Sequence, residues 1–334
     1  MRTKSLLLYA MRFVLTAVML AWLTTQVDLR SVAGVIAKAA PLWLLAGVFA
    51  HMLSVICSAW RWQQLLIGMG FQLRLLQLVR LVLAGAFFNM FLPSSVGGDL
   101  MKMVLLAPDL ERREAAISSV LMDRVVGLAV TIGVGLAAVL LLPSVWDDTG
   151  LLLSLGLALL AFAVGAAAMF SRRLIDLVAR LTPAFIWRRL GPTVLRVHAS
   201  LLMVGQRPDV LLKAAAISVL RQIAVCIAIF SAGQAFGLPV GPLAYFATVP
   251  LAMAISALPI AINGLGLQDN ALVFLLGFVG IAPVQALSLS IFLHALRNGT
   301  GLLGGAIFAL SRRRDAAAAQ GSPEPVAAPK AEVS

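Results

Sequence analysis

The stretch "FFNMFLPSSVGGDLMKMVLLA", residues 87–107, is an apolar run that a proline, two serines, two glycines and an aspartate interrupt. The chain around it has 334 residues, of which 61% are hydrophobic and 12% charged, and its mean hydropathy is +0.99. Several nearly uncharged stretches reach the roughly 20 residues that a helix needs to cross a bilayer. The composition therefore argues against a soluble domain and predicts an all-α polytopic membrane protein.

The apolar stretches divide into full-length spans and interrupted regions. Two regions, 75–107 and 243–280, are each broken by Pro, Gly and Asn. The polar tail, residues 311–334, is predicted to be disordered, so we treat residues 1–310 as one transmembrane domain. About six full transmembrane helices are expected, at residues 6–25, 41–60, 115–142, 150–170, 211–236 and 284–310.

The basic residues predict how the chain is oriented in the cell (cytoplasmic or inner) membrane. The net charge is +12, but Lys and Arg lie between apolar runs, which favours membrane topology over a nucleic-acid partner. The segment 172–207 mixes seven arginines with apolar residues, and we expect an amphipathic helix on the anionic lipids of the inner leaflet. Both termini are expected on the same, cytoplasmic side. Other residues assigned to that side are Arg61, flanked by the interfacial anchors Trp60 and Trp62, and Arg74, Arg80, Arg112 and Arg113.

Each interrupted region is predicted to return to the side from which it enters. The loops around 75–107 are basic, whereas those around 243–280 carry no charge. The part after the first break, 98–107, is about 15 Å long as a helix and too short to cross. We therefore predict two re-entrant helical hairpins from opposite faces, each followed by a full span, as in an inverted repeat. The order of motifs supports the repeat: "LPSSVGGD" (92–99) precedes "SSVLMDRVVGL" (118–128), and "LPIAINGLGLQD" (258–269) precedes "SLSIFLHALRNGTGL" (288–302).

The two breaks predict a polar site inside the membrane, because irregular backbone is tolerated there only beside protein or a water-filled cavity. A half-helix begins after each break, and its free N–H groups and partial positive charge suit an anion. The glycines that would present these groups are Gly97, Gly98, Gly264 and Gly266. Asp99 and Asp269 lie in or near the first turns and could instead cap these helix ends themselves, so both interpretations stay open.

Polar and charged residues within the full spans extend this site, because a charge at the bilayer centre costs roughly 2.5–3.5 kcal/mol and needs a partner or a cavity. The planar fork of arginine matches a phosphate, so Arg124, Arg297 and Arg221 are expected to bind a lipid phosphate. The residues expected to pair with these arginines, or to accept a cationic headgroup or a proton, are Asp99, Asp123, Asp269, His294 and Asn298. Three structural ion pairs are the open alternative. Lys102 is expected to snorkel to the surface.

Helical spacing places these polar residues on shared faces that should look inward. The faces are Ser290, His294, Arg297, Asn298 and Gly301; Ser119, Asp123 and Gly127; and Ser218, Arg221 and Gln222. The small residues Gly127, Thr131 and Gly135, and the pair Gly301 and Gly305, have the spacing of close helix packing.

In these blocks the chain resembles the membrane domain of lysylphosphatidylglycerol synthases and their stand-alone, flippase-like relatives. The resemblance is carried by "FFNMFLPSSVGGDLMK" (87–102), "SSVLMDRVVGL" (118–128) and "ISALPIAINGLGLQDNALVFLLG" (255–277), and it covers the chain to about residue 310. In the third block, the acid that the family often has after the glycines is matched by Asp269. The family implies movement of a phospholipid or polyprenyl-linked lipid between leaflets. The soluble aminoacyl-transferring domain of the two-part synthases is not expected after residue 310.

We therefore expect a lipid flippase or translocase with a central Arg/Asp-lined site, and not an enzyme. The sequence has no nucleophile–base pair, metal-ligand cluster or GxxxxGK[ST] motif, so no cofactor or metal is expected, and downhill movement or ion coupling remains as the driving force. One alternative is an intramembrane lipid-modifying enzyme with Asp99 and Asp123 as acid and base. The other is a non-catalytic scaffold that docks a lipid synthase or glycosyltransferase through 172–207.

Overall fold

The computed structural model is helical throughout its regular elements, and no strand occurs in the part of the chain that it describes. It describes residues 28–91, 97–110, 113–141, 171–182, 184–257 and 264–320, with scattered residues between 14 and 25 and between 150 and 167. The all-α prediction is confirmed. The predicted spans 6–25 and 150–170 lie largely outside the described residues, as do the centres of both breaks, 92–96 and 258–263.

Among the described residues, three helices are long and apolar enough to cross a membrane, as a multi-pass membrane protein requires. They are α3 (Pro41–Gly68), α6 (Arg113–Val139) and α10 (Pro208–Ala235). Each has 27 or 28 residues and is therefore about 40 Å long, more than the ~30 Å of a hydrocarbon core. The first and last of them begin with proline, which suits the first helical turn because its missing N–H needs no partner there.

The longest helix is α13 (Pro283–Gln320), which carries polar residues in its middle. His294, Arg297 and Asn298 interrupt its apolar surface, so it is less apolar than the three clear spans. It continues to Gln320, past the predicted span end at residue 310, and residues 321–334 lie outside the described part.

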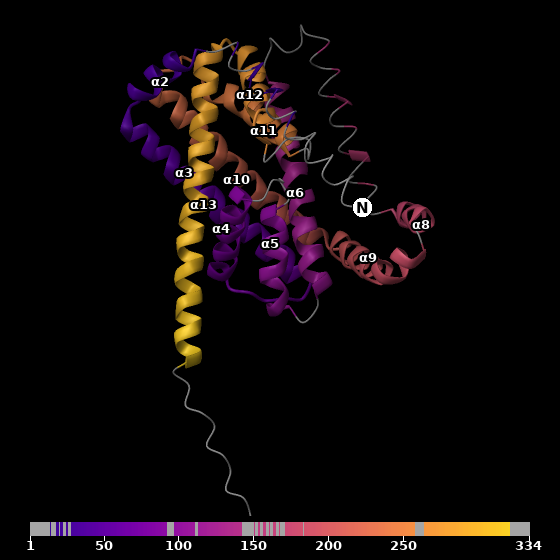
Figure 1. The fold of residues 1–334 in the computed structure, drawn as a ribbon. Coiled ribbons are helices and arrows are strands. Elements are labelled where there is room, and N and C mark those ends of the chain that lie inside the picture. Colours follow the sequence, from indigo (N-terminus) through magenta and orange to yellow (C-terminus); the bar gives the residue numbers. More distant parts are fainter. Residues whose placement is uncertain are drawn as a thin grey trace, which may run out of the picture.

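Helices α3 and α10 form an antiparallel pair at the centre of the molecule (Figure 1). The N–H of Ala40 donates to the carbonyl of Ala235 at 3.0 Å, so the start of α3 lies beside the end of α10. At the other end of the pair, Gly68 packs against Val210. The glycine is needed there because a Cβ at position 68 would lie 2.8 Å from a methyl group of that valine.

Four short helices fill the two interrupted regions. The first region contains α4 (Leu75–Phe91), α5 (Gly97–Leu106) and the 3-10 turn η1 (Ala107–Asp109), and the second contains α11 (Pro242–Ser256) and α12 (Leu267–Gly277). In Figure 1, α4 and α5 lie in the lower half of the molecule and α11 and α12 in the upper half.

The two ends of the first interrupted region lie close together. Gln77 near the start of α4 donates to Asp109 in η1, at 2.7 Å. In the second region, Leu238, just before α11, and Ile281, just after α12, are both buried in one large hydrophobic cluster.

The packing of the first set of helices has a counterpart in the second set. Helix α4 packs against α13 as α11 packs against α6, and α4 contacts α3 as α11 contacts α10. Helix α5 likewise contacts α6 as α12 contacts α13. When α3, α4, α5 and α6 are matched in order with α10, α11, α12 and α13, the main helix contacts of one set therefore recur in the other.

Three further helices lie around this bundle: α2 (Leu29–Ala37), α8 (Arg172–Leu181) and α9 (Ala184–Gly205). Helix α2 packs on α13 through Val32 and Leu287. Asp28 caps α2, and the hydrogen bond from Ser31, with that from the backbone of Arg30, lowers the pKa of Asp28. Helices α8 and α9 project to one side in Figure 1, and α9 contacts α6.

Small residues let α13 approach α4 closely, as predicted. A Cβ on Gly301, Gly304 or Gly305 would meet Met90, the Leu83 backbone or the ring of Phe87. On α6, Gly135 packs in the same way against Leu251 of α11. Close helix packing is thus confirmed for these positions, whereas Gly127 packs against an arginine side chain, described below.

We expect Gly98→Val to destabilise the crossing of α4 and α5. A Cβ at position 98 would lie 2.5 Å from the carbonyl oxygen of Gly85, and backbone cannot move aside as a side chain can. Overpacking of this kind typically costs about 1–3 kcal/mol. The measurement is the midpoint of thermal unfolding in detergent. Gly133→Val is the control, because nothing lies within 4 Å of a Cβ at position 133. Equal midpoints for the two variants would contradict this prediction.

Candidate functional site

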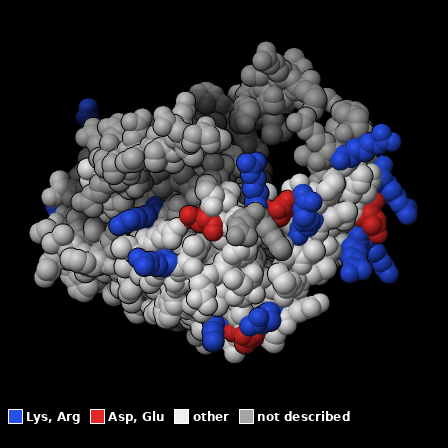
Figure 2. Space-filling view, turned by 90° about the horizontal axis from the view of Figure 1, so that it is seen from below, with Lys and Arg blue, Asp and Glu red and all other residues white. Residues whose placement is uncertain are grey.

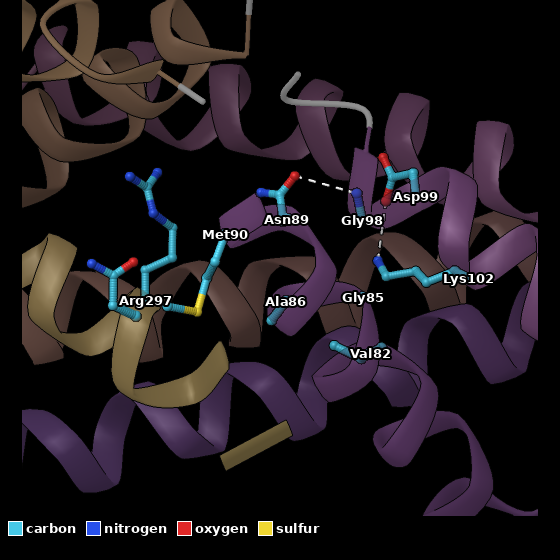
Figure 3. Close-up of a pocket in the computed structure, with 10 residues that line it drawn as sticks. Val82, Gly85, Ala86, Asn89, Met90, Gly98, Asp99, Lys102 and Arg297 are labelled. Carbon is cyan, nitrogen blue, oxygen red and sulfur yellow. Dashed lines mark hydrogen bonds and ion pairs between the residues drawn. The ribbon is translucent and has the colours of Figure 1, made fainter. Parts of the chain in front are cut away.

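A cavity of about 210 Å³ lies between α4, α5 and α13. In Figure 3, Arg297 stands at one side of the cavity, Asp99 and Lys102 stand at the other, and α4 runs between them. From Leu75 to Gly85 the path along α4 is about 15 Å, and from Pro283 to Arg297 along α13 it is about 21 Å. The cavity therefore lies well away from the first turns of both helices. Its lining residues are Val82, Gly85, Ala86, Asn89, Met90, Gly98, Asp99, Lys102, Arg297 and Asn298.

Asp99 holds two cations at one side of this cavity. Its Oδ1 pairs with Lys102 Nζ at 3.2 Å and its Oδ2 with Arg124 Nε at 2.9 Å. The first-turn N–H of Gly98 instead donates to Asn89 Oδ1 of α4, at 3.3 Å (Figure 3). The start of α5 is thus capped by a side chain of the neighbouring helix α4, and the carboxylate of Asp99 forms ion pairs with Lys102 and Arg124.

The predicted surface position of Lys102 is wrong. Its side chain is 16% exposed, pairs with Asp99 and lies with Nζ 5.8 Å from the centroid of the Trp62 ring. Residues three apart on a helix share a face, so Lys102 follows Asp99 into the interior. Contact with the aromatic ring stabilises the ammonium group there.

Asp269 forms a second cluster at the start of α12. Its Oδ2 accepts from the N–H of Gly266 at 2.8 Å, which caps α12. Its Oδ1 contacts Ser290 Oγ and, at 2.7 Å, His294 Nε2. Gly266 and Gly264 have φ values of +75° and +76°, a conformation that favours glycine. The capping alternative is therefore confirmed for Asp269, which is 3% exposed and also holds two side chains of α13.

Arg297 connects this second cluster to the cavity. Its Nη2 lies 2.7 Å from His294 Nδ1, and its Nη1 lies 3.5 Å from Gln268 Oε1. Because a guanidinium group only donates, Nδ1 of His294 must accept, and its Nε2–H donates to Asp269. The chain Arg297–His294–Asp269 therefore runs from the cavity wall to the start of α12.

The first acid of each short helix contacts a base at the same spacing. Asp99 pairs with Arg124, and Asp269 contacts His294; both intervals are 25 residues (124 − 99 and 294 − 269). The two pairs join α5 to α6 and α12 to α13, which are counterparts in the packing pattern.

A third cluster centres on Arg61 of α3 and Asp123 of α6. Two hydrogen bonds join them, Nε–Oδ1 at 2.7 Å and Nη2–Oδ2 at 2.9 Å. Arg61 is 5% exposed, and a Cβ at Gly127 would lie 2.7 Å from its Nη1, so the glycine makes room for the guanidinium group. The interfacial assignment of Arg61 and Trp62 is therefore wrong. Helix α3 continues to Gly68 and keeps both residues inside the bundle.

The three predicted polar faces contact different partners inside the bundle, although Asn298 of the α13 face is exposed. Ser119 accepts from Trp62 Nε1 at 3.1 Å, next to the Arg61–Asp123 pair. On α10, Ser218 accepts from Arg61, and Gln222 accepts from Thr131. Their neighbour Arg221 lies close enough to Arg61 and Asp123 to interact electrostatically.

The structure separates the predicted site residues into these three groups. The cavity brings together Gly98, Asp99, Arg297 and Asn298, with Arg124 bound to its Asp99 and Gly97 beside it in the chain. The second cluster contains Gly264, Gly266, Asp269 and His294; the third contains Asp123, with Arg221 nearby. Sequence reasoning missed Asn89 and Lys102 at the cavity and Arg61 in the third cluster. Among the described residues, no group of three or more His, Cys, Asp and Glu could hold a metal ion.

Comparison with known protein families gives one match across most of the chain. The family described as "Lysylphosphatidylglycerol synthase TM region" matches residues 9–305. No curated protein matches the chain.

Proposed function

The chain belongs to the lysylphosphatidylglycerol synthase transmembrane family, and on this premise we propose that it moves an anionic lipid between the leaflets of a bilayer. The substrate class is a phospholipid or a polyprenyl-linked lipid. Its phosphate enters the cavity between α4, α5 and α13, while its acyl chains stay in the bilayer. Arg297 and Lys102 receive the phosphate from opposite sides, and Arg124 contributes its charge through Asp99.

The observation that carries this proposal is a cavity between α4, α5 and α13 with an excess of cationic groups around it. Among the described residues, three cationic groups, Lys102, Arg124 and Arg297, line or adjoin it, and Asp99 is the acid in its lining. Such charges are costly inside a membrane and are retained where they serve a substrate path. The volume of about 210 Å³ is below that of pockets that enclose whole drug-sized ligands, ~300–1,000 Å³, so it suits a headgroup phosphate with the rest of the lipid outside.

The topology within this proposal is an inverted repeat with two re-entrant hairpins, α4–α5 and α11–α12. The paired helix contacts and the equal spacing of Asp99–Arg124 and Asp269–His294 support it. The hydrogen bond between Gln77 and Asp109, at the two ends of the first interrupted region, supports it as well. Full spans at 6–25 and 150–170 complete the proposed arrangement of six.

In the proposed orientation, both termini and the face that carries many Lys and Arg residues lie on the cytoplasmic side of the cell membrane. Figure 2 shows this face from below, with Lys and Arg spread across it and several of them beside acidic residues. We propose that segment 172–207 binds anionic lipids of the inner leaflet there and offers a surface to a lipid synthase or glycosyltransferase. In the described part of segment 172–207, the exposed arginines are Arg172, Arg173, Arg180, Arg188, Arg196 and Arg207, and Arg74 and Arg113 are exposed as well.

Transport accounts for the acids of this chain better than catalysis does. The enzyme alternative needs Asp99 and Asp123 to act as an acid and base pair. Each of them instead forms ion pairs with its own basic partners, Arg124 and Lys102 in one case and Arg61 in the other. The two acids therefore belong to separate ion-pair clusters and do not pair with each other.

The test is lipid movement in vesicles that contain the purified full chain. Vesicles of phosphatidylcholine and phosphatidylglycerol carry a trace of fluorescent phosphatidylglycerol, and a membrane-impermeant reductant quenches the label in the outer leaflet. We expect the protein to make the inner-leaflet label accessible much faster than in protein-free vesicles. Unchanged kinetics with labelled phosphatidylglycerol and with a labelled polyprenyl phosphate would reject lipid transport.

A further inference from the structure

We propose that His294 is a proton-binding site coupled to the cavity through Arg297, so that an anionic lipid headgroup and a proton move together. This inference rests on the proposed lipid transport and adds its driving force. The groups that carry it are the chain Arg297–His294–Asp269 and the Ser290 hydroxyl, which joins the same carboxylate.

The hydrogen bonds around His294 set its state when no headgroup is bound. Arg297 Nη2 donates to Nδ1 at 2.7 Å, so Nδ1 carries no proton. The ring is then neutral, and its Nε2–H donates to Asp269 Oδ1 at 2.7 Å. A proton on Nδ1 would point at the N–H of the guanidinium group. The ring therefore cannot be an imidazolium while Arg297 donates to Nδ1.

Binding of a phosphate in the cavity changes this balance. Arg297 lines the cavity, and a phosphate there competes with His294 for its N–H groups. Once the guanidinium group turns to the phosphate, Nδ1 is released and can take a proton from water. The imidazolium ring keeps its Nε2–H bond to Asp269, which becomes an ion pair. Headgroup binding therefore favours protonation of His294, and by linkage protonation favours headgroup binding to the same extent.

Charge balance gives this coupling a physical advantage. A headgroup with one negative charge and one bound proton add no net charge to the interior, whereas the phosphate alone would add one. Taking an uncompensated charge across the hydrocarbon core is costly, and the proton removes that cost. On release, Arg297 returns to Nδ1 and the proton leaves to water on the side where the lipid is delivered.

The polar groups in contact with His294 come from α12 and from α13 itself. From α12 it faces Asp269, and on α13 itself it faces Ser290 and Arg297. Helix α4 meets α13 through Leu83, Phe87 and Met90, and α2 meets it through Val32, all apolar. Other described ionisable residues on helices packed against α13 are Arg30 on α2, His51 and Arg61 on α3, Arg80 on α4, and Asp209, Lys213 and Arg221 on α10.

The experiment uses the same vesicles with a trapped pH-sensitive dye and an imposed pH gradient. One proton per lipid predicts that a gradient of one pH unit enriches the labelled phosphatidylglycerol up to about tenfold in the leaflet facing the alkaline side. Entry of the lipid into the inner leaflet should acidify the lumen. We expect His294→Gln to keep the hydrogen bonds to its neighbours but to lose both effects. The control is His51→Gln, whose residue bonds Thr300 of α13 at 3.0 Å and should leave both effects intact.

Each outcome separates this inference from the proposed function. Wild-type protein that moves lipid without enrichment or lumen acidification overturns proton coupling and leaves lipid transport standing. Wild-type protein that moves no lipid overturns the proposed function. Enrichment that persists in His294→Gln overturns the assignment to this residue. Should that variant not fold, wild-type protein in weakly buffered detergent decides: addition of short-chain phosphatidylglycerol should take up protons, and an unchanged pH overturns the inference.

Discussion

Replacing Arg297 by glutamine is expected to slow lipid movement by roughly 10- to 100-fold, from the ~1.5–3 kcal/mol of a hydrogen bond to a charged group. Arg297 lines the cavity and also contacts His294 and Gln268. Glutamine keeps a donor of similar shape but removes the charge and the fork that match a phosphate. The measurement is the initial rate of label exposure in vesicles that contain equal amounts of folded protein.

Two further variants make this result specific to the cavity. Arg297→Lys keeps the charge but loses the bidentate geometry, so its rate should fall between those of the wild type and Arg297→Gln. Arg196→Gln is the matched control. Arg196 pairs with Glu114 at 2.8 Å, but its side chain is 60% exposed, and exposed pairs contribute little. A wild-type rate in folded Arg297→Gln would move the lipid site away from this cavity.

The sequence predicted the helices well wherever an apolar run has clear limits. The spans expected at 115–142 and 211–236 match α6 and α10 to within a few residues, because arginine and proline mark their starts. The end of α3 was missed, since Trp-Arg-Trp at 60–62 has the pattern of a membrane interface. The buried position of Arg61 depends on its ion pair with Asp123. That residue lies 62 residues further along the chain, so the local sequence gives no sign of it.

The candidate site was predictable in its residue types but less so in its pairings. The acids and bases of the spans were all expected to face inward, because unpaired charges are costly there. Asp99 does pair with a predicted partner, Arg124. Asp269, however, contacts His294 and Ser290, which lie three and seven residues before Arg297 on α13. Which acid meets which base depends on helix rotation and depth, and one sequence constrains neither closely.

Asp123→Ala is expected to be the most destabilising substitution considered for this protein. It leaves Arg61, 5% exposed, without the carboxylate that accepts two of its hydrogen bonds. Removing one partner of a buried ion pair typically costs about 3–5 kcal/mol. The thermal midpoint in detergent or lipid nanodiscs measures this loss. Asp209→Ala is the control, because the Arg207–Asp209 pair is exposed and its loss should leave the midpoint unchanged.

A double variant, Arg61→Met with Asp123→Ala, separates a structural role of this pair from a transport role. Replacing both charges by apolar groups removes the unpaired guanidinium, so much of the lost stability should return. Because the pair lies outside the lining of the cavity, lipid movement by the double variant should then approach the wild-type rate. A double variant that regains its thermal midpoint but moves no lipid would instead place Arg61, Asp123 and the neighbouring Arg221 on the path of the headgroup. The substrate would then pass between α3, α6 and α10, and the cavity at Arg297 would be one of several binding sites along the transport path.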